Sequence, residues 1–128
     1  MKMFSREWVE VFNEKLKNDD DFQEKADGFD SKFQFMIEPD PKAGVSENLS
    51  FGLNLPPCDE FWCGVRPESD VDIILQGKYG NLQSVMTGKT GLIVALATGK
   101  VKLKKGSQTK LVGYMGAVNR FIEIARGV

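Results

Sequence analysis

The 128-residue sequence contains no histidine and only two cysteines, Cys58 and Cys63. Without histidine, neither a Ser-His-Asp nor a Cys-His catalytic arrangement can form, and the commonest general base of enzymes is missing. Two cysteines without histidine cannot complete a structural zinc site, and two thiols are too few for the disulfide framework of a small secreted domain. We therefore expect a non-catalytic protein with two free cysteines, no bound metal and no cofactor.

Long apolar segments are also missing. The longest apolar run, 92–97, is far shorter than the roughly 20 residues that span a bilayer as a helix. Residues 1–7 lack the apolar stretch of a secretory signal peptide. We accordingly expect a cytoplasmic protein, and a chain of this length fits a single domain over residues 1–128.

The charged residues nearly balance, but they are unevenly distributed. The formal net charge is −1, whereas residues 89–128 carry eight basic side chains and a single acidic one, Glu123. The rest of the chain therefore holds the acidic excess. This asymmetry has two interpretations: one face of the fold attracts anions, or the two halves pair with each other.

Apolar residues three and four positions apart predict helices at both ends of the chain. The stripe that predicts the first helix is formed by Phe4, Trp8, Val11, Phe12 and Leu16. Ser5 is its predicted N-cap, and Asp21 with Glu24 resembles a capping box for a short second helix that ends at Gly28. Further helices are predicted at 82–86, 92–97 and 107–125.

Alternation of apolar and polar residues predicts strands in the middle of the chain. In the first strand Phe33, Phe35 and Ile37 alternate with polar side chains. The same alternation predicts strands at 49–55, 61–65, 71–75 and 101–103. Because the connections are short, we predict an α/β (α+β) domain in which an antiparallel meander of about five strands, rather than βαβ crossovers, is covered by helices.

The second half of the chain carries an ordered series of short motifs. Residues 69–75 are followed by 82–87, Gly88-Lys89, 92–97, Gly99-Lys100-Val101-Lys102-Leu103 and Gly106. This order of strand, short helix, Gly-Lys, short helix, Gly-Lys-containing strand and glycine resembles the sterol carrier protein type 2 family. The second motif departs conservatively from the Gly-Lys-Leu-Lys pattern of that family.

The resemblance implies a mostly antiparallel sheet covered by helices on one side, with a hydrophobic tunnel between sheet and helices. It also implies non-catalytic binding and transfer of fatty acids, acyl-CoA, sterol-like or isoprenoid lipids. Two other functions stay open: a dimerising or accessory module with a closed core, and a component that presents an acyl ligand within an enzyme complex. A homodimer is compatible with each of them. The aromatic residues are concentrated in the acidic part of the chain, which disfavours a nucleic-acid partner.

Nine apolar residues are the candidate lipid-binding residues of this tunnel: Phe33, Phe35, Phe51, Leu53, Trp62, Met86, Met115, Val118 and Phe121. Each lies on an apolar face of a predicted element, and methionine can adapt its shape to varied ligands. The same residues would also fit a closed core, and the sequence leaves both arrangements open.

Three lysines, Lys100, Lys102 and Lys104, project to one side of the predicted fifth strand. They indicate either a contact for an anionic headgroup or membrane surface, or a solvated strand face whose lysines discourage edge pairing. The final predicted helix contains Gly113 and Gly116, each of which lowers helix stability by about 1 kcal/mol relative to alanine. We therefore expect this helix to act as a movable lid.

Overall fold

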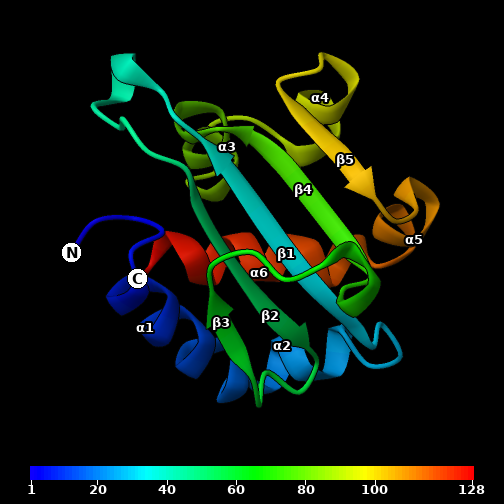
Figure 1. Cartoon of the computed structure of the whole chain (residues 1–128). Coiled ribbons are helices and arrows are strands. Elements are labelled where there is room, and N and C mark those ends of the chain that lie inside the picture. The colour runs from blue at the N-terminus through cyan, green and yellow to red at the C-terminus, as the bar shows by residue number, and fades with distance from the viewer.

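A computed structural model describes residues 1–128 and contains five strands in one sheet. The strands are β1 (Ser31–Glu38), β2 (Leu49–Leu55), β3 (Phe61–Cys63), β4 (Ile73–Lys78) and β5 (Val101–Lys105). The helices are α1 (Arg6–Lys17), α2 (Asp20–Lys25), α3 (Tyr79–Met86), α4 (Leu92–Ala97), α5 (Gln108–Gly113) and α6 (Met115–Arg126). Figure 1 shows α1, α2 and α6 behind the sheet, so the predicted α+β fold is confirmed.

The strand order is β3-β2-β1-β4-β5, and three of the four neighbouring pairs are antiparallel. The central pair, β1 and β4, is parallel, so the sheet is mixed and the predicted simple meander is wrong at this point. The chain leaves β1, builds β2 and β3, and returns beside β1 only after the segment 64–72. Hydrogen bonds fix that return, because the Lys32 N–H donates to the Asp72 carboxylate (2.8 Å) and the Asp72 N–H to the Lys32 carbonyl (2.9 Å).

The two faces of the sheet differ in what covers them. Phe33, Phe35 and Ile37 of β1 face the helices and belong to the main core of 30 buried residues. On the other face, the loop after β3 folds over a small cluster formed by Trp62, Val71, Ile74 and the half-buried Met36. The buried Gln34 holds this loop, because its Oε1 accepts hydrogen bonds from Trp62 Nε1 (3.0 Å) and from the Arg66 N–H (2.9 Å).

The N-terminal helices are capped by short polar side chains. Ser5 Oγ accepts a hydrogen bond from the Trp8 N–H (3.3 Å), which confirms the predicted N-cap of α1. The N-cap of α2 is Asp19 instead of the predicted Asp21; its Oδ2 accepts from the Phe22 N–H (2.8 Å). Arg120 of α6 donates two hydrogen bonds to the same carboxylate, at 3.0 and 2.7 Å, and so joins α6 to the start of α2.

The predicted continuous helix over 107–125 is divided at Tyr114 into α5 and α6. Tyr114 has φ −114° and ψ 31°, so its backbone leaves the helical region and the chain changes direction. As Figure 1 shows, α5 lies beside the end of β5, whereas α6 runs along the back of the sheet. None of the helices has the length and apolar character needed to cross a membrane.

Candidate functional site

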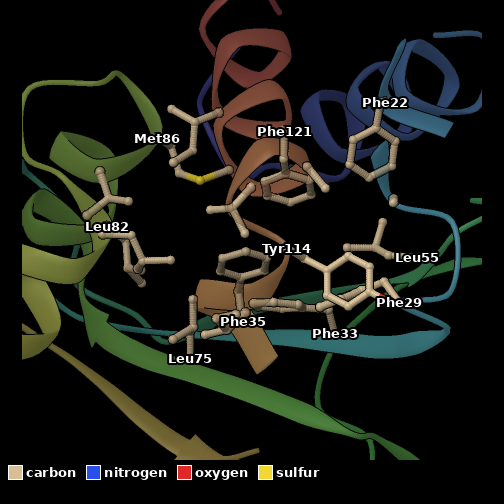
Figure 2. Close-up of a pocket in the computed structure, with 17 residues that line it drawn as sticks. Phe22, Phe29, Phe33, Phe35, Leu55, Leu75, Leu82, Met86, Tyr114 and Phe121 are labelled. Carbon is tan, nitrogen blue, oxygen red and sulfur yellow. The ribbon is translucent and has the colours of Figure 1, made fainter. Parts of the chain in front are cut away.

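A cavity with an entirely apolar lining lies between the sheet and the C-terminal helices (Figure 2). Strands β1, β2 and β4 form its floor, while α3, α4, α5 and α6 together with the segment around α2 enclose it. The lining residues are Phe22, Ala26, Phe29, Phe33, Phe35, Leu55, Leu75, Leu82, Val85, Met86, Leu92, Leu111, Tyr114, Ala117, Val118, Phe121 and Ile122. No charged side chain contributes, so the lining offers only apolar contacts.

Aromatic rings join the floor to the helix above it. Phe33 and Phe35 point to the same side of β1, since side chains two positions apart share a face, and their ring centroids lie 4.9 Å apart. Phe121 reaches down from α6 and stacks on Phe35 at 6.1 Å and on Phe33 at 6.4 Å. Figure 2 shows these rings in the middle of the lining, with Met86 and Leu82 at one end. The rings therefore occupy the centre of the space that a ligand would fill.

The free space within this lining is small. It amounts to about 40 Å³, which exceeds the roughly 10–15 Å³ needed by one water molecule. Pockets for small molecules usually measure about 300–1,000 Å³. A lipid chain fits only if the helices and aromatic rings move apart.

A surface groove of about 490 Å³ continues from one end of the cavity. The groove and the cavity share the lining residues Val85, Leu92, Val118 and Ile122. Beyond these shared residues the groove becomes polar, where the loop from Gly88 to Gly91 faces the C-terminal half of α6. The apolar interior thus reaches the surface between α4 and α6.

Five of the nine candidate tunnel residues line the cavity: Phe33, Phe35, Met86, Val118 and Phe121. Met115 lies in the groove instead. Phe51 and Leu53 are fully buried beside the cavity, where Phe51 packs between Phe35 (4.7 Å) and Phe4 (5.7 Å).

Trp62 lies on the opposite face of the sheet and takes no part in the cavity. Its ring covers Gly52 of the neighbouring strand so closely that a Cβ at Gly52 would lie 2.0 Å from the indole. In β3 it is Phe61 that packs against the main core. The placement predicted for Trp62 was wrong. Phe61 and Trp62 are adjacent aromatic residues in a short strand, so the alternation of apolar and polar residues could not show which of them faces the helices.

The sequence prediction did not include several lining residues. Leu111, Tyr114 and Ile122 share the predicted apolar face of the final helix with Val118 and Phe121, so that face already contained the signal for them. The remaining missed residues come from strands, turns and helices, including α6 itself: Phe22, Ala26, Phe29, Leu55, Leu75, Leu82, Val85, Leu92 and Ala117. They meet only through tertiary packing, which the periodicity of each separate element does not specify.

The three predicted lysines lie at the exposed edge of the sheet formed by β5. Lys104 is paired, since its Nζ lies 3.7 Å from Glu68 Oε1, and both side chains remain largely exposed. Lys100 and Lys102 are exposed and form no ion pair. The neighbouring Lys105 has a structural role, because its Nζ donates to the backbone carbonyls of Glu68 and Val71.

Both cysteines are free. Cys58 is fully buried, and desolvation raises the pKa of its thiol to about 12. At neutral pH this thiol is protonated, which makes it a poor nucleophile. Cys63 is exposed on the short edge strand β3. Groups of three or more cysteine, aspartate or glutamate side chains placed to hold a metal ion do not occur.

No protein-family profile matches the sequence, and no curated protein matches it significantly. Solved structures do match. A crystal structure of sterol carrier protein 2 is 25% identical, with a TM-score of 0.84 over 99% of both chains. A solution structure from Thermus thermophilus, described as possibly a sterol carrier protein, is 25% identical with a TM-score of 0.83, over 99% of this chain and 90% of that one.

A third match is a sec-alkylsulfatase from Pseudomonas sp., with 23% identity and a TM-score of 0.54. It covers 74% of this chain but only 14% of the alkylsulfatase, and at this identity it shows a shared fold alone. The architecture of this chain is a five-stranded mixed sheet with six helices, of which α1, α2 and α6 lie behind the sheet (Figure 1). The chain folds as a sterol carrier protein 2-like domain.

Proposed function

We propose that residues 1–128 form a single domain that binds a lipid-like apolar molecule in the cavity beneath α6, without catalysing a reaction. The observation that carries this proposal is the wholly apolar lining between sheet and helices, which continues into a groove at the surface. Burial of each CH₂ group contributes about 0.8 kcal/mol, so a long chain gains affinity without a specific polar contact. Fatty acids, acyl-CoA, sterol-like and isoprenoid lipids all belong to the expected class of ligand.

Binding requires space, and α5 is the element best suited to provide it. Leu111 is the only buried residue of α5, and Val112 is 51% exposed. Lys110 holds the helix in place, since its Nζ donates to Ser31 Oγ (2.7 Å) and lies 5.0 Å from the centre of the Phe29 ring. Phe29 lines the cavity at the end opposite Met86 and Leu82 (Figure 2).

In contrast, α6 is firmly attached to the rest of the fold. Arg120 binds Asp19 through two hydrogen bonds, and Lys15 Nζ donates to the Gly127 carbonyl (2.8 Å) at the end of the helix. We infer that the lid consists of α5 and Tyr114, and that α6 stays in place. Outward movement of α5 would displace Leu111 and Tyr114 and enlarge the cavity for the tail of the ligand.

We also propose that the β5 edge contacts anionic membranes while the ligand is exchanged. Lys100 and Lys102 are exposed without acidic partners, and Val94 of the adjacent helix α4 is 57% exposed. Each lysine near an anionic surface contributes about 1 kcal/mol of attraction. Exposed apolar and basic side chains together are typical of a surface that touches a membrane interface.

A second candidate function is that of an accessory module with a closed core within a larger enzyme assembly. The small free volume of about 40 Å³ favours it, as does the fold shared with one part of an alkylsulfatase. The two functions differ in whether the lining opens for a ligand.

A substitution that fills the cavity separates these functions. Ala117 lies in the lining and is 5% exposed, so Ala117→Leu places three extra carbon atoms in the cavity. For a carrier, the variant should bind a fluorescent fatty-acid analogue several-fold more weakly than the parent, and Ala43→Leu, the same change at an exposed site, should bind normally. Circular dichroism checks the folding of both variants. A closed module would bind the analogue in none of the three proteins.

A further inference from the structure

We propose that Arg126 binds the anionic head of the ligand, so that the preferred cargo is a long-chain carboxylate whose head lies in the groove between α4 and α6. This inference rests on the proposed lipid-binding function and adds a polar site to it. The groove is the place where the apolar cavity reaches the surface, and Arg126 is part of its lining.

One face of α6 leads from the cavity to this arginine. Val118, Ile122 and Arg126 follow one another at intervals of four residues, so they lie on the same side of the helix. Val118 and Ile122 line both the cavity and the groove, whereas Arg126 lines the groove alone. At 1.5 Å per residue, the distance along the helix from Val118 to Arg126 is about 12 Å. An amphiphile lying along this face meets apolar side chains first and a guanidinium at the end.

The guanidinium of Arg126 is free to bind a ligand. It forms neither an ion pair nor a hydrogen bond, and the side chain is exposed. The other arginine of α6, Arg120, already binds Asp19 and lies 3.5 Å from Glu123. Glu123 also lines the groove and lies near Arg120, whose positive charge is shared with Asp19 and Asp21 as well. Among the basic side chains of α6, Arg126 is therefore the one available to an anion.

The loop at the end of α3 supports the guanidinium from one side. A Cβ at Gly88 would lie 3.0 Å from Arg126 Nη1 and 3.1 Å from Cζ, so the absence of a side chain at Gly88 allows the close approach. The backbone of Gly88 has φ +78°, a conformation that residues other than glycine rarely adopt. The adjacent Lys89 is exposed and has no acidic partner, which adds a second positive charge near the groove.

This arrangement favours a carboxylate over an uncharged head. A guanidinium can donate two parallel hydrogen bonds to one carboxylate, and bonds between charged groups are stronger than those between neutral groups. The groove is partly exposed to solvent, which reduces the effect, and we expect a preference of about five-fold or more for an acid over the alcohol of equal length. The preference should decline as salt is added, since the contact is screened.

The test compares a 16-carbon fatty acid with the 16-carbon alcohol, each competing with an uncharged fluorescent probe for the cavity. In the parent protein both should displace the probe, and the acid should do so at the lower concentration. Arg126→Gln should weaken binding of the acid by about five-fold and leave binding of the alcohol unchanged. Arg126→Lys should retain part of the preference for the acid. Arg6→Gln, an equivalent change at an exposed site on α1, should change neither. Hexadecyl phosphate, used as a third competitor, shows whether another anionic head binds the same arginine.

The results also separate this inference from the function on which it rests. If acid and alcohol bind the parent and Arg126→Gln affects both or neither, the head site is not at Arg126, although lipid binding stands. If neither compound displaces the probe or stabilises the parent against heat, lipid binding itself fails and the head site fails with it. Because Arg126 has no bonding partner in the fold, the variant should melt at the parent temperature, and that measurement guards against a folding artefact.

Discussion

The rings of Phe35 of β1 and Phe121 of α6 lie nearly parallel, with their centroids 6.1 Å apart and their planes within 7° of each other. The pair joins the floor of the apolar cavity to the helix above it, so a ligand that enters the centre must separate or displace these rings. Their stacking also contributes to stability, because aromatic pairs add roughly 0.5–1.5 kcal/mol beyond the burial of their surface. The same contact therefore links the stability of the domain to its capacity for ligands.

Removal of the Phe121 ring should lower the stability of the domain and enlarge the cavity. Phe121→Ala should lower the free energy of unfolding by about 3–5 kcal/mol, as expected for a buried phenylalanine. A long-chain ligand should restore part of that loss, because it fills the new space in the folded state only. Urea unfolding with and without fatty acid measures both effects. Val112→Ala on the exposed side of α5 is the control, and a loss below about 1 kcal/mol for Phe121→Ala would disprove the central role of the ring.

Alanine at Gly116 should stabilise the domain. A Cβ there would have Lys25 Cδ as its nearest neighbour, at 3.8 Å, which is an ordinary van der Waals contact. Close packing therefore does not require glycine, and Gly116→Ala should raise the free energy of unfolding by about 0.5–1 kcal/mol. Chemical denaturation measures the change. A destabilised variant would mean that the added methyl group clashes, and that close packing at the start of α6 does require glycine.

Release of α5 should accelerate ligand exchange. In Lys110→Met the hydrogen bond to Ser31 and the contact with the Phe29 ring are lost, while most of the aliphatic chain is kept. Amide hydrogen exchange should become faster in residues 108–114 and stay unchanged in β1 and β4. Added fatty acid should slow the exchange of residues 108–114 again. Equal amide hydrogen-exchange rates of residues 108–114 in parent and variant would show that α5 is not the lid.

The bond between Asp19 and Arg120 should make stability depend on pH. Hydrogen bonds from Arg120 hold the pKa of the Asp19 carboxyl below its ordinary value. Since the unfolded-state pKa is about 3.9, this bond stabilises the fold above about pH 4, and its contribution is lost as the pH falls through the folded-state pKa. Asp19→Asn keeps an N-cap for α2 but loses the charge.

The stability difference between the parent and Asp19→Asn should therefore be largest near neutral pH and shrink in acid. Unfolding by urea at a series of pH values measures it. Asp20→Asn removes a charge from the same helical turn without touching Arg120, and it is the control for the loss of one carboxylate. A difference for Asp19→Asn that is independent of pH would refute the assigned bond.

Reversal of the basic edge should impair transfer to charged membranes. Replacement of Lys100, Lys102 and Lys104 by glutamate should slow the transfer of a fluorescent fatty acid to anionic vesicles, and added salt should reduce the difference from the parent. Lys104 should contribute least, because it already pairs with Glu68. Transfer to neutral vesicles is the internal control. If the triple variant matches the parent with anionic vesicles at low salt, the lysines serve only as a solvated strand edge.

Local patterns in the sequence predicted the elements well but not how they meet. The apolar stripe with Trp8, Phe12 and Leu16 marks the buried face of α1, and all three side chains are buried. The parallel pairing of β1 with β4 was missed, because the register between Phe35 and Leu75 depends on the path of the whole intervening chain.

The residues of the candidate site were likewise predicted only in part. Periodicity identified Phe33, Phe35 and Phe121, which lie on regular alternating or helical faces. It failed at Trp62, whose position follows from the missing side chain at Gly52 on another strand, and at Tyr114, where a helix-compatible pattern continues through a break in the backbone. Such features depend on contacts between distant residues, for which a single sequence carries no direct signal.

The central claim is that this small cavity opens to hold a lipid, and native mass spectrometry of the freshly purified protein tests it most directly. The account predicts a population heavier than the polypeptide by the mass of one long-chain lipid, which is released on denaturation and reappears after incubation with fatty acid. Ala117→Leu should retain much less of it than the parent. Bare polypeptide mass alone, both after purification and after incubation with several lipid classes, would contradict the account and leave the closed accessory module as the function of this domain.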